Sequence, residues 1–152
     1  MSTHKQGNLG GLVRLRSVRE RDSRIGLATA LKEERAAAAK EADLQQLLAN
    51  LPMPATFDLA AFQGRQHTVE MIRTALADTR ATLETAHHIT TAARDRWVSD
   101  RSRLAAVESL VERRAAAVRA ERTRRETREL DEVAQEMWRR RTRTAVVDGG
   151  VR

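Results

Sequence analysis

Between Arg65 and Asp148 the chain contains neither glycine nor proline, the two residues that interrupt helices most reliably. Alanine, arginine, glutamate, leucine and valine fill most of this interval instead. A continuous helix over it would be about 120 Å long at a rise of about 1.5 Å per residue, which exceeds the diameter of a small domain. The sequence therefore predicts an all-α rod, and rods serve as partners, stalks or levers more often than as enzymes.

The composition narrows the classes of partner. Only 3% of the residues are aromatic and much of the 41% hydrophobic content is alanine, so a thick core is not expected. A net charge of +7 favours acidic partners, such as nucleic acid, an anionic membrane surface or an acidic protein. The absence of cysteine excludes disulfides and thiolate metal sites. With no long apolar run and a polar start, we expect a soluble cytoplasmic protein without a transmembrane segment.

Breaks in the pattern divide the chain into a disordered tail (1–11), a helix (12–51), a turn (52–57) and a second helix (58–148). Pro52 and Pro54 end the first helix, because the residue before a proline is pushed out of the helical region. Thr56 or Asp58 can cap the next helix, and Gly149 with Gly150 can stop it. We expect residues 12–148 to form a single antiparallel coiled-coil hairpin domain.

The second helix carries a seven-residue repeat, which predicts a left-handed coiled coil. Its first row is Phe62, Val69, Leu76, Leu83, Thr90, Trp97, Leu104, Val111 and Val118, and its second row contains Ile72, Thr79, Ala86, Ala93 and Val107. Beyond Val118 the repeat becomes polar. A short apolar patch then returns out of phase, at Leu130, Val133, Met137 and Trp138.

The first helix shows a thinner apolar stripe, at Leu15, Val18, Ile25, Ala28, Leu31, Ala39, Ala42 and Leu47. Folding the chain about residue 54 would place Ile25 near Leu83, Leu31 near Leu76 and Ala39 near Val69. The first helix would then end opposite Trp97, at the base of the hairpin. The rest of the second helix, about 104–143, would overhang without an intramolecular partner, and we expect it to be a docking surface.

No catalytic or metal-binding pattern is present, so we expect no enzyme activity and no cofactor. His87 and His88 are adjacent and point to different parts of a helix surface, which is typical of solvated residues rather than metal ligands. Most arginines alternate with acidic residues and read as ion pairs on a solvated face. The least balanced arginine cluster is Arg139, Arg140, Arg141 and Arg143, which also suits the negative end of a helix.

The chain resembles the flagellar export protein FliJ family over nearly its whole length. The resemblance rests on the opening LVRLRSVRERDSRIGLATAL (12–31), on RWVSDRSRLAAVESLVERR (96–114), and on RRETRELDEVAQEM (124–137) with its Leu130-Asp131-Glu132-x-Ala134 segment. It implies an antiparallel coiled-coil stalk that docks into the hexameric flagellar export ATPase, promotes its assembly and activity, and links it to the export gate membrane protein and export chaperones. Such a protein would lie in the cytoplasm, peripheral to the inner face of the cell membrane at the flagellar base.

Two sets of contact residues follow as hypotheses. The ATPase-binding set comprises Leu15, Val18, Arg21, Arg122, Arg125, Leu130, Val133, Met137, Trp138, Arg139, Arg140 and Arg141. The set for the export gate or chaperones comprises Thr68, Ile72, Ala75 and Thr79.

Three alternatives remain open from the residues. A nucleic-acid-associated coiled coil would use the arginine face, although interleaved acids and scarce aromatics argue against direct nucleic-acid binding. A homodimeric rod would pair its overhangs between chains. A stalk protein of an injectisome-type secretion system would share the same architecture.

Overall fold

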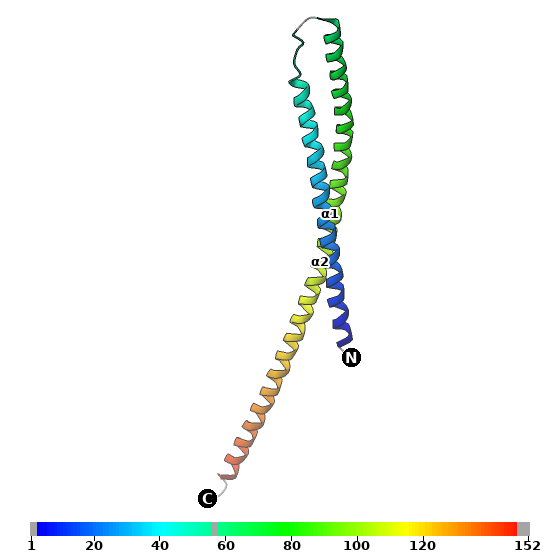
Figure 1. Cartoon of the computed structure of the whole chain (residues 1–152). Coiled ribbons are helices and arrows are strands. Elements are labelled where there is room, and N and C mark those ends of the chain that lie inside the picture. The colour runs from blue at the N-terminus through cyan, green and yellow to red at the C-terminus, as the bar shows by residue number, and fades with distance from the viewer. Residues whose placement is uncertain (1–2, 56–57, 149–152) are drawn as a thin grey trace. The chain divides into compact units, whose positions relative to one another are not determined.

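The computed structural model of the chain describes residues 3–55 and 58–148, and within them side chains over 9–55 and 58–143. Every regular element in that part of the chain is helical: α1 spans Thr3–Ala49 and α2 spans Leu59–Asp148 (Figure 1). The chain divides into two compact units, Met1–Ala105 and Ala106–Arg152, and α2 contributes to both.

The helix boundaries differ from the predicted ones mainly at the amino-terminal end. The helix α1 begins at Thr3 rather than near Leu12, so residues predicted as a disordered tail are helical from Thr3 onward. Gly10 and Gly11 do not break the helix, because a helix interior tolerates glycine at a cost of about 1 kcal/mol each. Residues 1–2 of that predicted tail, and the predicted stop at Gly149 and Gly150, lie outside the described residues.

The connector between the helices follows the predicted chemistry. The helix α1 ends at Ala49, just before the Leu51-Pro52 step that disfavours helical geometry. The Asp58 carboxylate accepts a hydrogen bond from the Ala60 N–H at 3.4 Å, and its carbonyl oxygen accepts the first helical hydrogen bond, from Phe62, at 3.0 Å. Asp58 is therefore the N-cap of α2, one of the two candidates that the sequence offered. The other candidate, Thr56, lies outside the described residues.

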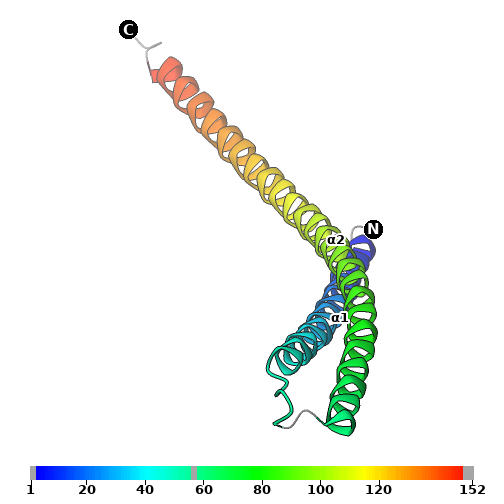
Figure 2. The same ribbon diagram turned by 90° about the horizontal axis from the view of Figure 1, so that it is seen from above.

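In the first unit, α1 and the first part of α2 run antiparallel and side by side (Figures 1 and 2). Three side-chain contacts fix their direction: Glu20 with Trp97, Glu34 with His87, and Glu41 with Arg80. As the residue number rises along α1 it falls along α2. The predicted antiparallel helical hairpin is confirmed in this unit.

The predicted seam of α2 is confirmed where large side chains form it. Val69, Ile72 and Leu76 are buried at 8%, 6% and 6% exposure, and Thr79 and Thr90 are buried with them. The exceptions lie at the two ends of the first row: Phe62 is 60% exposed, Val111 37% and Val118 59%. The seven-residue repeat therefore identified the face of α2 that packs on α1.

The predicted stripe of α1 is wrong. Of its eight members only Leu31 is partly buried, and Leu15, Val18, Ile25 and Leu47 are about half exposed. The residues that face α2 are mostly small or acidic instead: Glu20, Ser23, Leu27, Ala30, Glu34, Ala37, Glu41, Leu44 and Leu48. They alternate in steps of three and four, as a coiled coil requires. A prediction based on large apolar residues does not detect a row of mostly small and acidic residues.

The predicted pairing of the helices is wrong as well. The sequence paired Ile25 with Leu83, whereas the observed contacts place Glu34 and Glu41 near that part of α2. The described segment from Asn50 to Ala55 does not turn back directly, because it runs on past the end of α1 (Figure 1). Each residue of α1 therefore meets a residue of α2 with a higher number than a symmetrical fold about residue 54 predicts. Trp97 meets Glu20, and α1 continues for several turns before Glu20, so Trp97 does not close the base of the hairpin.

Candidate partner-binding surfaces

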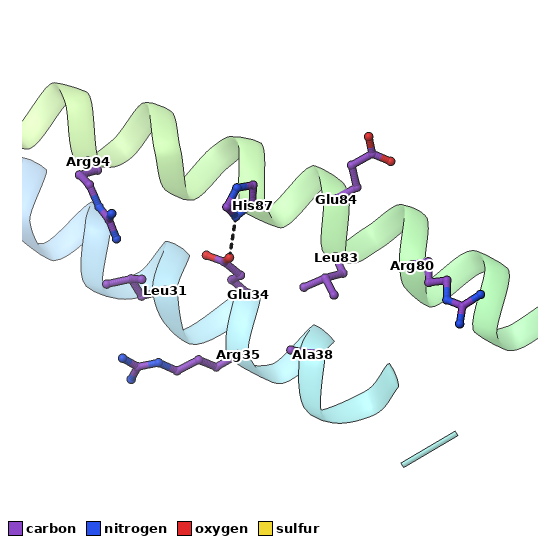
Figure 3. Close-up of a pocket in the computed structure, with 9 residues that line it drawn as sticks. All are labelled: Leu31, Glu34, Arg35, Ala38, Arg80, Leu83, Glu84, His87 and Arg94. Atoms are coloured by element: carbon purple, nitrogen blue, oxygen red, sulfur yellow. Dashed lines mark hydrogen bonds and ion pairs between the residues drawn. The ribbon is translucent and has the colours of Figure 1, made fainter. Parts of the chain in front are cut away.

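One flank of the hairpin in the first unit carries a charged groove. It is lined by Leu31, Glu34, Arg35 and Ala38 of α1, and by Arg80, Leu83, Glu84, His87 and Arg94 of α2 (Figure 3). His87 Nδ1 donates a hydrogen bond to Glu34 Oε1 at 2.9 Å across the groove. Two helical turns further along, Arg80 Nε donates to Glu41 Oε1 at 2.8 Å. These two contacts join the helices on this flank.

The surroundings of Glu34 favour its charged form. Its pKa is lowered from 4.5 first by the hydrogen bond from His87 and then by the nearby Thr90 hydroxyl, while partial burial opposes the shift and the charges of His87 and Arg94 add to it. The Thr90 hydroxyl is itself buried, and it reaches no partner with good hydrogen-bond geometry. Glu34 is thus the acidic residue of the groove that depends most on the hairpin being closed.

Trp97 of α2 contacts α1 beyond the charged groove and so joins the two helices. Its indole N–H donates to Glu20 Oε1 at 3.0 Å, and the Arg101 guanidinium lies over its ring at 5.3 Å from the centroid. Trp97 is half-buried, so its ring packs against neighbours while its N–H meets a carboxylate. The predicted packing role of this tryptophan is confirmed, although its place along the hairpin is not.

Two hollows lie on the other flank of the hairpin. One is formed around Gly26 and Ala30 of α1 and Ala92 of α2, the other around Ala81 and Thr85 of α2, and Ile89 lines both. No residue of the charged groove lines either hollow. This flank is therefore formed mainly by small residues, with one half-exposed isoleucine between the hollows.

The second unit presents an exposed apolar patch. Leu130 is 70% exposed, Val133 56%, Met137 59% and Trp138 67%, and we call these four residues the C-terminal patch. Their spacing of three, four and one places them on one broad face of α2. An exposed tryptophan beside an exposed methionine is typical of a surface that binds another protein.

The arginines near the C-terminal patch are of two kinds. Arg122, Arg125 and Arg140 form ion pairs one turn away, with Glu126 at 3.1 Å, Glu121 at 3.3 Å and Glu136 at 2.6 Å. Such exposed pairs add little stability. Arg139 and Arg141 form no ion pair within residues 9–55 and 58–143. These two arginines are therefore free to meet an acidic partner.

The predicted ATPase-binding residues are all exposed. Leu15, Val18 and Arg21 lie in the first unit, and the remaining nine lie in the second. The two groups are therefore described unit by unit. Each remains a separate candidate surface.

The predicted gate or chaperone residues divide into two kinds. Ile72 is 6% exposed and Thr79 4% exposed, both within the seam against α1. Ala75 is partly buried, and Thr68 is exposed. A partner that binds the closed hairpin here would contact Thr68, the edge of Ala75 and the neighbouring Met71, which is 61% exposed.

The sequence reasoning missed Glu20, Glu34 and Glu41 as the residues that join the helices. Their spacing of fourteen and seven residues was the available signal, because residues seven apart share a face of a coiled coil. Across the described side chains, no group of three or more histidines and carboxylates is arranged to hold a metal ion. Neither helix, as far as it is described, has a stretch long and apolar enough to cross a membrane.

Comparison with known proteins yields one family. A family model described as flagellar FliJ protein matches residues 5–143, which is nearly the whole chain. No curated protein and no solved structure matches the chain.

Proposed function

The chain belongs to the flagellar FliJ protein family, and from this premise we propose that it is the non-catalytic stalk of a flagellar protein export apparatus. The family implies a role in flagellar export and a structural rather than enzymatic part in it. In our proposal the stalk docks into the hexameric export ATPase, promotes its assembly and activity, and links it to the export gate and to chaperones. It acts in the cytoplasm, at the inner face of the membrane.

The observation that supports docking is the C-terminal patch with its unpaired arginines. A helix that exposes Leu130, Met137 and Trp138 to water gains free energy when a partner covers them, at about 25 cal/mol per Å² of apolar surface. Arg139 and Arg141 add attraction to an acidic opening. We propose that the carboxyl-terminal part of α2 overhangs the hairpin, and that its end enters the ATPase ring.

The amino-terminal contacts are a second part of the same proposal. Leu15 and Val18 are half exposed and Arg21 is exposed, so this end of α1 offers an apolar surface next to a positive charge. We assign it to the ATPase as well. Contact with the gate or a chaperone would use Thr68 and Ala75, and would reach Ile72 and Thr79 only if the helices separate.

Binding to the export ATPase of the same organism tests the proposal. We expect saturable binding and a changed rate of ATP hydrolysis at both low and moderate salt. Replacing Arg139, Arg140 and Arg141 together by alanine should weaken binding about tenfold or more, because charged and apolar contacts at the patch act together. The matched control replaces Arg113, Arg114 and Arg119, which removes the same charge from the same helix outside the patch.

Equal losses in both triple variants would show that only net charge matters, and would overturn the assignment of the patch. No ATPase binding, together with salt-sensitive binding to random DNA, would replace the stalk proposal with the nucleic-acid one, since counterion release makes such binding fall steeply with salt.

A further inference from the structure

The flank of the hairpin that carries the two hollows lacks a covering element within the described residues. An added Cβ at Gly26 would meet no atom within 4 Å, so the space beside it is open. Ile89, which separates the hollows, is 51% exposed although it is the largest apolar side chain that lines them. An exposed isoleucine between two depressions has the form of a surface that receives the side chains of another helix.

Unpaired charges border these hollows. Asp22 and Arg96 lie at the first hollow and Glu33 at the second. None of the three forms an ion pair within residues 9–55 and 58–143. On the other flank, at the charged groove, two carboxylates already have basic partners. Glu34 is paired with His87 and Glu41 with Arg80. The polar edge of the hollow-bearing flank therefore offers two carboxylates and one guanidinium that have no ion-pair partner among the described side chains, although Arg35 and Glu84 of the charged groove have none either.

The C-terminal patch has the complementary shape and charge. Its bulky side chains project from one face of a helix, whereas the hollows are bordered by glycine, alanine and threonine. Arg139 and Arg141 form no ion pair among the described side chains, and could meet the carboxylate of Glu33. Glu132 is exposed and forms no ion pair within residues 9–55 and 58–143, and could meet Arg96. The same chain thus carries both halves of a matching contact.

The lengths also agree. The hollows extend along α2 from Ala81 to Arg96, about 22 Å at a rise of about 1.5 Å per residue. The helical segment from Leu130 to Arg143 is about 20 Å long by the same rise. One segment of this helix can therefore lie along both hollows, with its patch over Ile89 and its arginines at one end.

We propose that the protein associates with a second copy of itself, the C-terminal patch of one copy lying in the hollows of the other. The contact is small, about four turns of helix, so it forms a weak and reversible complex. Its apolar part is the patch on Ile89 and the alanines. Its polar part consists of the arginine and carboxylate pairs at the edges, which set the direction of the docked helix.

The mass of the full chain in solution tests this proposal. In sedimentation or light-scattering experiments between about 1 and 200 μM, a range that suits weak association, the mass should rise from 17.1 kDa toward about twice that value. Ile89→Lys should abolish the rise. The matched control is Val98→Lys, because Val98 is 54% exposed on the same helix but lines neither hollow. Helical circular dichroism shows whether each variant is folded.

A mixture of two variants identifies the surfaces. Trp138→Ala should also abolish association, while Val118→Ala, at a 59% exposed valine outside the patch, should not. Mixing the Ile89→Lys chain, which keeps its patch, with the Trp138→Ala chain, which keeps its hollows, should restore association of one with the other. A constant mass at all concentrations would overturn the proposal. Failure of the mixture to associate would also overturn it, because an intact patch and an intact pair of hollows would then not bind each other.

Discussion

At the scale of single residues, the hairpin depends on acidic side chains of α1 that lie among the mostly small residues facing α2. Glu34 illustrates this because its carboxylate has a hydrogen-bond donor, His87, on the other helix and a lowered pKa. A carboxyl group whose pKa is lower in the folded than in the unfolded chain stabilises the fold above its unfolded pKa, and that stabilisation is lost as the pH falls through the folded value.

We therefore expect a pH-dependent difference between the natural chain and Glu34→Gln. The natural chain should unfold at a higher temperature above about pH 4.5, the unfolded pKa, and this advantage should shrink as the pH falls below it. Thermal unfolding followed by circular dichroism from about pH 6 to pH 3 measures the difference. Glu33→Gln is the control, since Glu33 is exposed and forms no ion pair with any side chain that the structure describes. A difference that stays constant with pH would contradict the assigned role of Glu34.

Gly26 offers a second test at this scale. A glycine inside a helix costs about 1 kcal/mol relative to alanine, and open space surrounds the position where a Cβ would stand. Gly26→Ala should thus raise the free energy of unfolding by about 0.5–1 kcal/mol in urea titrations. The reverse change nearby, Ala28→Gly at another exposed position of α1, should lower it by a similar amount. A loss of stability in Gly26→Ala would show that the glycine serves close packing.

At the scale of the helices, the register of α1 against α2 is the decisive feature. Ala30 and Ala93 line the same hollow, whereas folding about residue 54 would have brought Ile25 beside Leu83. The observed register follows from the long connector and from the three contacts of Glu20, Glu34 and Glu41. Carboxylates that meet specific donors specify register more sharply than alanines do, since small side chains pack with little preference.

Cross-linking distinguishes the two registers. The chain contains no cysteine, so introduced pairs are the only reactive thiols. A short bifunctional maleimide should join cysteines placed at Ala30 and Ala93 within one chain, and should join cysteines at Ile25 and Leu83 at least about fivefold more slowly, because proximity sets the effective concentration of the two thiols. Digestion and mass spectrometry identify the joined peptides. Faster joining of the second pair would favour the register expected from a symmetrical turn.

At the scale of the whole molecule, the two proposals involve the same surface. The C-terminal patch cannot lie in the ATPase ring and on a second copy at once. Self-association would then keep an apolar surface covered while the protein is away from its partner, which protects it from unspecific contacts. The consequence is a competition that can be measured.

We expect the export ATPase, added in excess, to dissociate the self-associated protein into complexes with single copies. The Ile89→Lys chain, unable to receive a patch, should bind the ATPase at least as tightly as the natural chain at high protein concentration, since no self-contact must first be broken. Native mass spectrometry or sedimentation of the mixtures measures both effects. An ATPase complex that retains the doubled stalk would show that the two contacts use different surfaces.

Particular residues show how much could be predicted. The repeat of Val69, Leu76 and Leu83 identified the packed face of α2, because large apolar side chains at seven-residue spacing leave one face to bury. Asp58 was recognised as a possible cap from its residue type and its place after the prolines. The stripe of α1 could not be found this way, since Ser23, Ala30 and Ala37 carry little hydrophobic signal and glutamates carry none.

The sequence by itself determined the helical class, the two long helices, the break between them and the family, because these follow from local backbone preferences and from residue patterns along the chain. Only the tertiary structure decided which face of α1 is buried and which residues of the two helices meet. These features depend on side chains far apart in sequence. Because most of the α1 residues that face α2 are small, a few polar contacts between the helices set the register. These contacts join residues far apart in sequence, so the sequence alone does not show them.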